Sequence, residues 1–248
     1  MGRCLSGVLA AVMLIAVAPA FAGGTATQMW RCELDDDATE DLVVKAAQKW
    51  LAAAKTMAGG ENLEASIYFP VAVNGNGETD IIFVINAPTF KEWGRFWDGY
   101  KDSPAANLDK ENGDMIVPTD SALWEVIKAK SPSAPKSAGK VTQVWRCEMG
   151  DDATEEEVMK AADKWVAAAK TMAGGENLEA NVYFPIAVNN NGGTDLLFVI
   201  NMPTFEEYGE FWDGFADSPA ANLDKENGGI VIPTDSALWE SIKVEAAE

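Results

Sequence analysis

Arginine and glutamate recur two residues apart at two matching places in this chain, where they could contact a small polar ligand. The first pair is Arg31 and Glu33, in the stretch QMWRCEL, and the second is Arg146 and Glu148, in QVWRCEM. Both stretches alternate in the manner of a β-strand, and residues two apart on a strand share a face. Each Arg–Glu pair therefore lies opposite the apolar face of its strand.

The recurrence reflects a tandem duplication. The stretch AAAKTMAGGENLEA occupies residues 52–65 and, letter for letter, residues 167–180. DSPAANLDKENG and PTDSALWE also occur twice at the same offset, and no insertion or deletion separates the copies. We therefore expect one domain copied in tandem, with every feature present twice. The expected organisation is a signal peptide at residues 1–22, a first repeat at 23–129, a linker at 130–140 and a second repeat at 141–248.

Each copy predicts the element order β-α-β-β-α-β. Apolar residues at spacings of three and four predict an amphipathic first helix, which should begin after the N-cap residue Thr39 and end before two glycines. An aromatic-rich second helix should begin after Thr89. Residues 103–112 predict a short helical turn with a loop, and Pro118 should interrupt the last strand. In the first copy, strands are expected at 28–34, 63–73, 80–86, 115–117 and 121–128, and helices from the caps Thr39 and Thr89 to about residues 57 and 100.

The two faces of these strands predict two environments. Tyr68 and its counterpart Tyr183 lie opposite the aliphatic face of their strands, as the arginines do. We expect the apolar faces under the helices and the polar faces towards a lumen between the copies. A buried Arg and Glu must be paired or hydrogen-bonded. Two interpretations stay open: Arg–Glu pairs that lock the two sheets together, or a pocket for a polar or aromatic small ligand.

The element order and the aromatic second helix resemble the dimeric α+β barrel superfamily, with its antibiotic-biosynthesis-monooxygenase-like and EthD-like proteins. The resemblance implies an α+β fold in which two ferredoxin-like repeats form an intrachain pseudo-dimeric barrel, so that a monomer acts as a pseudo-dimer. Cofactor-independent monooxygenases of this superfamily act on bound aromatic substrates with Trp, Asn and Arg. An aromatic stripe at helical spacing is also typical of a core. The matching positions are Arg31, Asn86 and Trp97 in the first copy and Arg146, Asn201 and Trp212 in the second.

Composition excludes several classes of site. The chain has no histidine, which excludes Ser-His-Asp and Cys-His catalysis, histidine metal sites and a histidine haem ligand. We expect no cofactor and no metal. The Asn-rich stretches at 74–80 and 189–195 predict hairpin turns rather than calcium loops. A formal net charge of −20 disfavours nucleic acid and anionic membrane surfaces as partners.

The N-terminus has the pattern of a secretory signal. Arg3 precedes an apolar run, and Ala20-Phe21-Ala22 is typical of a cleavage site. We expect a periplasmic or secreted protein without a membrane anchor. Cys32 and Cys147 are then the cysteines of the processed chain; a disulfide between them is one interpretation, and two buried free thiols are the favoured one.

Three functions stay open at this level. The leading hypothesis is an exported acidic protein of unassigned role that binds a small organic ligand between its two repeats. The second is a cofactor-independent monooxygenase or isomerase of the barrel type. The third is a structural or stress-related envelope protein with a packed lumen.

Overall fold

The computed structural model describes residues 24–73, 79–130, 139–189 and 193–247. The expected signal peptide, the turn at 74–77 and most of the linker lie outside these residues, as does part of the second Asn-rich stretch. The strands are β1 (Thr25–Leu34), β2 (Glu64–Ala72), β3 (Ile81–Ala87), β4 (Ile116–Lys128), β5 (Val141–Met149), β6 (Glu179–Ala187), β7 (Leu196–Met202) and β8 (Val231–Val244). The helices are α1 (Glu40–Lys55), α2 (Phe90–Asp98), α3 (Pro104–Asn112), α4 (Glu155–Ala169), α5 (Phe205–Asp213) and α6 (Pro219–Asn227).

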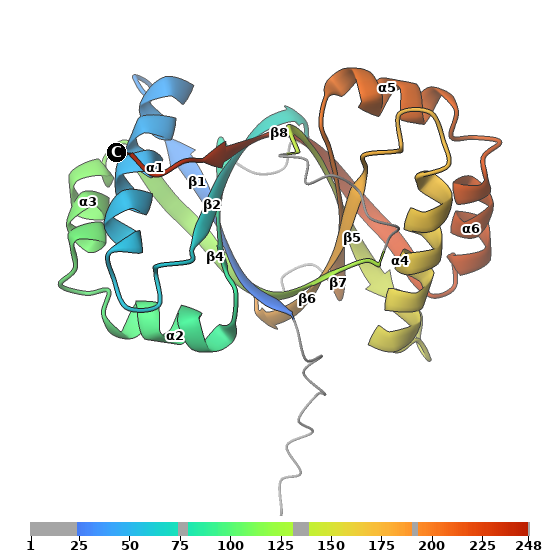
Figure 1. Cartoon of the computed structure of the whole chain (residues 1–248), viewed down its shortest axis with the longest axis horizontal. Helices are drawn as coiled ribbons and strands as arrows, with labels where there is room; N and C mark the ends of the chain where they lie inside the picture. The colour runs from blue at the N-terminus through green and yellow to red at the C-terminus, as the bar shows by residue number, and fades with distance from the viewer. Residues whose placement is uncertain (1–23, 74–78, 131–138, 190–192, 248) are drawn as a thin grey trace, which may run out of the picture.

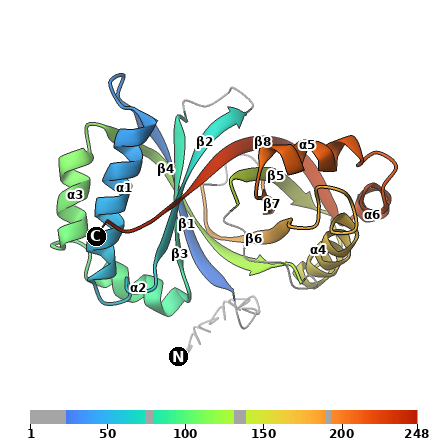
Figure 2. The same cartoon turned by 45° about the horizontal axis from the view of Figure 1, so that its top comes forward.

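All eight of these strands form one closed antiparallel barrel in the order β1-β3-β2-β8-β5-β7-β6-β4. Strands β1 to β4 are contiguous in the barrel wall, and so are β5 to β8. The two sets meet along two seams, β2 with β8 and β4 with β6. Helices α1 to α3 cover one outer side of the barrel and α4 to α6 the other, as Figure 1 and the turned view of Figure 2 show. The fold class is therefore α+β.

Local sequence signals account for the helix boundaries. The Thr39 side chain accepts a hydrogen bond from the backbone N–H of Leu42 at the start of α1, and Thr154 forms a capping box with Glu157 at the start of α4. After α1, Gly59 adopts φ +86°, a conformation that glycine reaches without steric cost. The α1 helix ends at Lys55, two residues before the predicted end, since Thr56 and Met57 form a tighter turn.

Two predicted elements differ from the structure. Residues 104–112 form the complete helix α3, because Ser103 caps its first turn and Pro104 occupies a position that needs no N–H donor. Strand β4 continues through Pro118 rather than stopping there. The register with β1 shifts between Arg31 and Cys32, opposite this proline, and such irregularities tolerate a residue that cannot donate to the ladder.

The barrel wall has two apolar faces. Apolar strand residues pack under the helices on the outer face, as expected, but the inner face, which the sequence predicts to be polar, is largely apolar too. On the outer face, Cys32 and Ile67 join α1 residues in one core cluster, and Cys147 lies in the equivalent cluster beneath α4. The inner face carries further clusters around Tyr68 and Tyr183. Among the described residues, none of the helices is both long and apolar enough to cross a membrane.

Candidate ligand pocket

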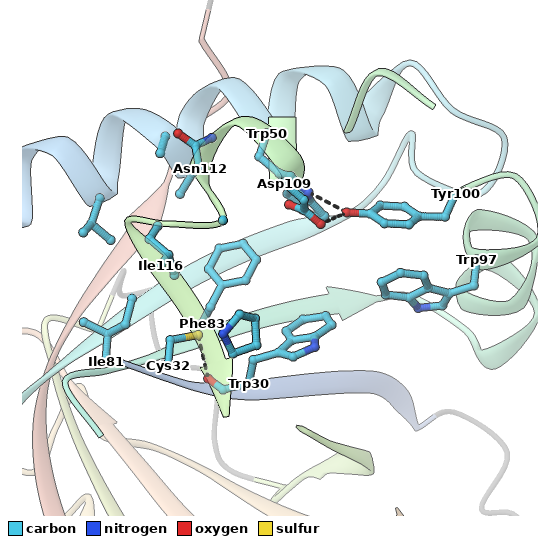
Figure 3. A pocket seen from close by; sticks show the side chains of 15 residues that line it. Trp30, Cys32, Trp50, Ile81, Phe83, Trp97, Tyr100, Asp109, Asn112 and Ile116 are labelled. Carbon is cyan, nitrogen blue, oxygen red and sulfur yellow. Dashed lines mark hydrogen bonds between the residues drawn. The ribbon is translucent and has the colours of Figure 1, made fainter. Parts of the chain in front are cut away.

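A cavity of about 280 Å³ lies between the outer face of the first four strands and the helices that cover it. Its walls contain five aromatic side chains, shown in Figure 3. These are Trp30, Trp50, Phe83, Trp97 and Tyr100. The volume lies just below the range usual for pockets that bind drug-sized ligands. The cavity therefore suits a small molecule.

Strands β1, β3 and β4 and helices α1, α2 and α3 contribute to this lining. Residues of β1 and β3 form the floor, since alternate side chains of a strand point to one face. Helix α1 contributes Ala46, Ala47 and Trp50. Trp50 follows the two alanines by four and three residues, so all three lie on one side of the helix. The two alanines leave room where larger side chains would fill the space. Trp97 comes from α2, and α3 supplies Asp109 and Asn112.

The aromatic rings support one another. The rings of Trp97 and Tyr100 lie 4.5 Å apart between centroids, and those of Trp30 and Trp97 lie 6.1 Å apart. The ring of Trp50 meets that of Phe83 edge-on at 5.4 Å. Such inclined contacts are favourable beyond the area they bury. The walls of the pocket are therefore held by ring-to-ring packing.

The polar groups gather at one end of the pocket. The indole N–H of Trp50 donates to the Tyr100 hydroxyl over 3.1 Å, and this hydroxyl donates to the carboxylate of Asp109. Asp109 is exposed on one side. Partial burial nevertheless raises the pKa of its carboxyl group, while the hydrogen bonds of Tyr100 and Trp50 counteract the rise. Burial also raises the pKa of Tyr100, so that its hydroxyl stays a donor.

The thiol of Cys32 lines the apolar part of the pocket. Cys32 and Cys147 are both free and buried, and each belongs to a different core cluster. Burial raises the pKa of each thiol to about 12. The reactive form of cysteine is the thiolate, so Cys32 contributes packing rather than nucleophilic chemistry.

The second half of the chain changes the polar end. Trp165 and Asp224 match Trp50 and Asp109, but Phe215 stands where Tyr100 would be. Burial raises the pKa of Asp224, and a hydrogen bond with Trp165 opposes this rise. A hydroxyl is therefore missing from the second polar end, although its carboxylate and indole are present.

The inner side of the barrel holds Tyr68 and Tyr183, the residues expected to contact a ligand in the lumen. Their side chains are 7% and 5% exposed, and their hydroxyl groups interact with each other. Trp124 and Trp239 pack into the same inner clusters. Large side chains thus occupy space that the sequence assigned to a ligand.

The remaining expected site residues do not form one constellation. Trp97 and Trp212 pack on the outer face, whereas Asn86 and Asn201 point inward. Each asparagine accepts a hydrogen bond from a threonine hydroxyl on the neighbouring strand, over 2.6 Å and 2.8 Å. The sheet therefore separates Trp97 from Asn86, which the resemblance had placed at one substrate.

The arginines and glutamates also differ in their surroundings. Arg31, Arg146 and Glu33 are half-buried, and Glu148 is exposed. The ion pairs found among the described residues all join lysine to glutamate. The arginine–glutamate lock between the sheets is thus not formed in this part of the chain.

Sequence reasoning missed the polar end of the pocket. Asp109 and Asn112 follow the buried Ala105 and Ala106 at helical spacing, which is a signal for a shared helix face. The prediction of a short helical turn with a loop at residues 103–112 hides this signal. Trp50 and Tyr100 were recognised only as members of amphipathic helices.

No protein-family model matches the sequence, and no curated protein matches it. Solved structures do resemble its fold. A candidate monooxygenase from Lactobacillus acidophilus aligns with a TM-score of 0.59 at 10% identity, over 90% of this chain and 96% of that one. A candidate monooxygenase from Fusobacterium nucleatum aligns with a TM-score of 0.58 at 10% identity, over 91% and 96%. The chain has the dimeric α+β barrel fold.

A candidate chlorite dismutase shares this barrel fold, with a TM-score of 0.51 at 8% identity over 88% of this chain and 95% of that one. At such low identity the barrel fold alone is shared, because one fold supports many unrelated activities. The function therefore has to be argued from the pocket.

Proposed function

We propose that this protein binds one small, largely apolar organic molecule in the pocket between the first four strands and helices α1 to α3. The observation that carries the proposal is a cavity of about 280 Å³ whose walls hold five aromatic side chains, with polar groups confined to one end. Aromatic walls bury a planar or compact apolar ligand well. Asp109, Tyr100 and Asn112 then orient its polar group.

The sequence predicts a ligand site in the lumen. The proposed site instead lies outside the barrel, beneath helices α1 to α3. The inner clusters support this change, because Tyr68 and Tyr183 approach each other there. On the outer side, small residues of α1 face large aromatic ones and leave space.

The proposal includes the duplicated organisation of the chain. Two ferredoxin-like repeats joined as an intrachain pseudo-dimer account for the matching strand registers, in which Trp30 pairs with Phe83 and Trp145 with Phe198. The proposal also includes export by a signal peptide at residues 1–22, and an acidic surface. The protein would then be a periplasmic or secreted binding protein.

A filling substitution tests the pocket. Ala47→Leu adds a side chain to the cavity wall, whereas Ala162→Leu makes the same change at the matching position of α4. Native mass spectrometry of the protein purified from its own source should show a bound small molecule in the parent chain and in Ala162→Leu. The adduct should be lost in Ala47→Leu.

Loss of the adduct in both variants, with both still folded by circular dichroism, would place the ligand elsewhere. Absence of any adduct from the parent chain would favour the third class, a structural envelope protein. An overfilled core typically costs about 1–3 kcal/mol, so thermal unfolding of both variants should accompany the measurement.

A second candidate function is a cofactor-independent monooxygenase-like or isomerase-like enzyme. The specific observation in its favour is the Asp109–Tyr100 couple at the polar end, where burial raises the pKa of the carboxyl group. A carboxylate with a raised pKa is a better general base near neutral pH. The fold shared with candidate monooxygenases adds support from analogy only. Asp109→Asn should then abolish turnover of a bound compound while leaving its binding measurable.

A further inference from the structure

The pocket has one carboxylate and no basic side chain in its lining. Asp109 is the one ionisable carboxylate among the residues that surround the cavity, and neither lysine nor arginine is among them. Its hydrogen-bond partners, Tyr100 and Trp50, are neutral donors. Within the described residues no lysine or arginine forms an ion pair with it. The Asp109 carboxylate at the polar end of the pocket is thus not paired with a lysine or arginine in the part of the chain that the structure describes.

The field of this carboxylate reaches across the pocket. Cys32 lies on the β1 floor, and the charge of Asp109 contributes to the raised pKa of its thiol, after the larger effect of burial. The whole chain adds a formal net charge of −20. A surface of one sign raises the local concentration of counter-ions at a cleft. Both effects attract a cation and repel an anion.

The aromatic rings provide the second element of a cation site. Trp30 and Trp97 are inclined by 57° to each other, as are Trp97 and Tyr100. Rings set at such angles surround a space with faces and edges from several directions. A cation over the face of a tryptophan or tyrosine is attracted by the ring quadrupole. Several rings with one carboxylate are the surroundings that suit an alkylated ammonium group.

We propose that the ligand of this pocket is a small organic cation, whose ammonium group contacts the rings of Trp30, Trp97 and Tyr100 and is balanced by Asp109. This inference rests on the proposed function and specifies its ligand class. A neutral ligand gains only apolar burial at this site. An anionic ligand meets the carboxylate without a basic partner.

Choline and its neutral isostere 3,3-dimethylbutan-1-ol test the ligand class by isothermal titration calorimetry at low ionic strength. The two molecules have nearly the same shape and differ in charge. We expect choline to bind at least about tenfold more tightly, consistent with the strength of desolvated cation–π contacts. Asp109→Asn should weaken choline binding by about tenfold and leave the isostere unaffected. Asp224→Asn, the matched change in the second half, should weaken choline binding less, because Phe215 there replaces Tyr100 of the proposed site.

Three outcomes would overturn the proposal that the ligand is a cation balanced by Asp109. Equal or tighter binding of the isostere would overturn the cation class while the pocket itself stands. Equal losses in Asp109→Asn and Asp224→Asn would remove the role of Asp109. No binding of either compound would also overturn it, and the adduct measured with Ala47→Leu would then decide the proposed function separately. If Asp109→Asn does not fold, the comparison of choline with its isostere in the parent chain decides alone.

Discussion

The hydroxyl of Tyr100 joins α1 to α3 by bonding to Asp109 while it accepts the indole N–H of Trp50. The second half of the chain keeps the tryptophan and the carboxylate but has Phe215 at the tyrosine position. This single oxygen atom is therefore the main polar difference between the two helix-covered sites.

Tyr100→Phe should lower stability, because it removes one of the two acceptors of the Trp50 N–H and the hydroxyl that donates to Asp109. Loss of a partly buried hydrogen-bonded group typically costs about 1–3 kcal/mol. We expect a fall of this size in the free energy of unfolding from urea denaturation. Phe215→Tyr adds a hydroxyl beside Trp165 and Asp224, so it should cost less than the reverse change. Equal losses in both variants would contradict the asymmetry.

Gly59 lies between α1 and β2 with a positive φ of 86°, and its backbone packs against α2. A Cβ atom there would lie 2.4 Å from the carbonyl oxygen of Glu92. Gly59→Ala should therefore lower the free energy of unfolding by about 1–3 kcal/mol, the usual cost of such backbone strain. Gly94→Ala is the control, since its Cβ meets nothing within 4 Å inside α2. The control should stabilise the helix by about 0.5–1 kcal/mol.

The inner tyrosines predict a loss of stability at alkaline pH. Burial raises the pKa of Tyr68 from 10.0 to about 12 and that of Tyr183 well above its usual value. The unfolded chain releases these protons first, so the stabilisation is complete below pH 10 and is lost as the pH rises towards 12. Tyr68→Phe should make the decline of unfolding free energy between pH 9 and pH 11 shallower. An unchanged slope would show that Tyr68 titrates normally in the folded protein.

The buried thiols predict a difference in reactivity. In protein lacking residues 1–22, two thiols per chain should react with an aromatic disulfide reagent after denaturation without reductant. The native protein should react slowly at pH 8, because burial raises the pKa of Cys32 and Cys147 to about 12 and only the thiolate attacks. A denatured chain without reactive thiols would reveal a disulfide.

Much of the fold could be predicted from the alternation of apolar and polar residues along strands and from the stretches of sequence that occur twice. Trp30 and Cys32 alternate with Arg31, and this pattern correctly placed the first two on the helix side. The helices followed from caps such as Thr39. These signals are local, so they are readable without knowing what the strand packs against.

The pocket could not be predicted in the same way. It exists because Ala46 and Ala47 of α1 lie opposite Trp30 and Phe83, which are distant in sequence. The filling of the lumen likewise depends on Tyr68 and Tyr183 meeting across the barrel. Space between elements is set by long-range packing, whereas the periodicity of one segment reports only which of its sides is buried.

The seams β2–β8 and β4–β6 give each set of four strands its outer neighbours from the other set. Pulling the sets apart would strip hydrogen-bond partners from four strands at once. We therefore expect the two sets to unfold cooperatively. A destabilising change beneath α5 should also destabilise the pocket beneath α1 to α3. The two sets of four strands are thus parts of one closed wall, although Tyr100 in one half and Phe215 in the other give their helix-covered sides different polar groups.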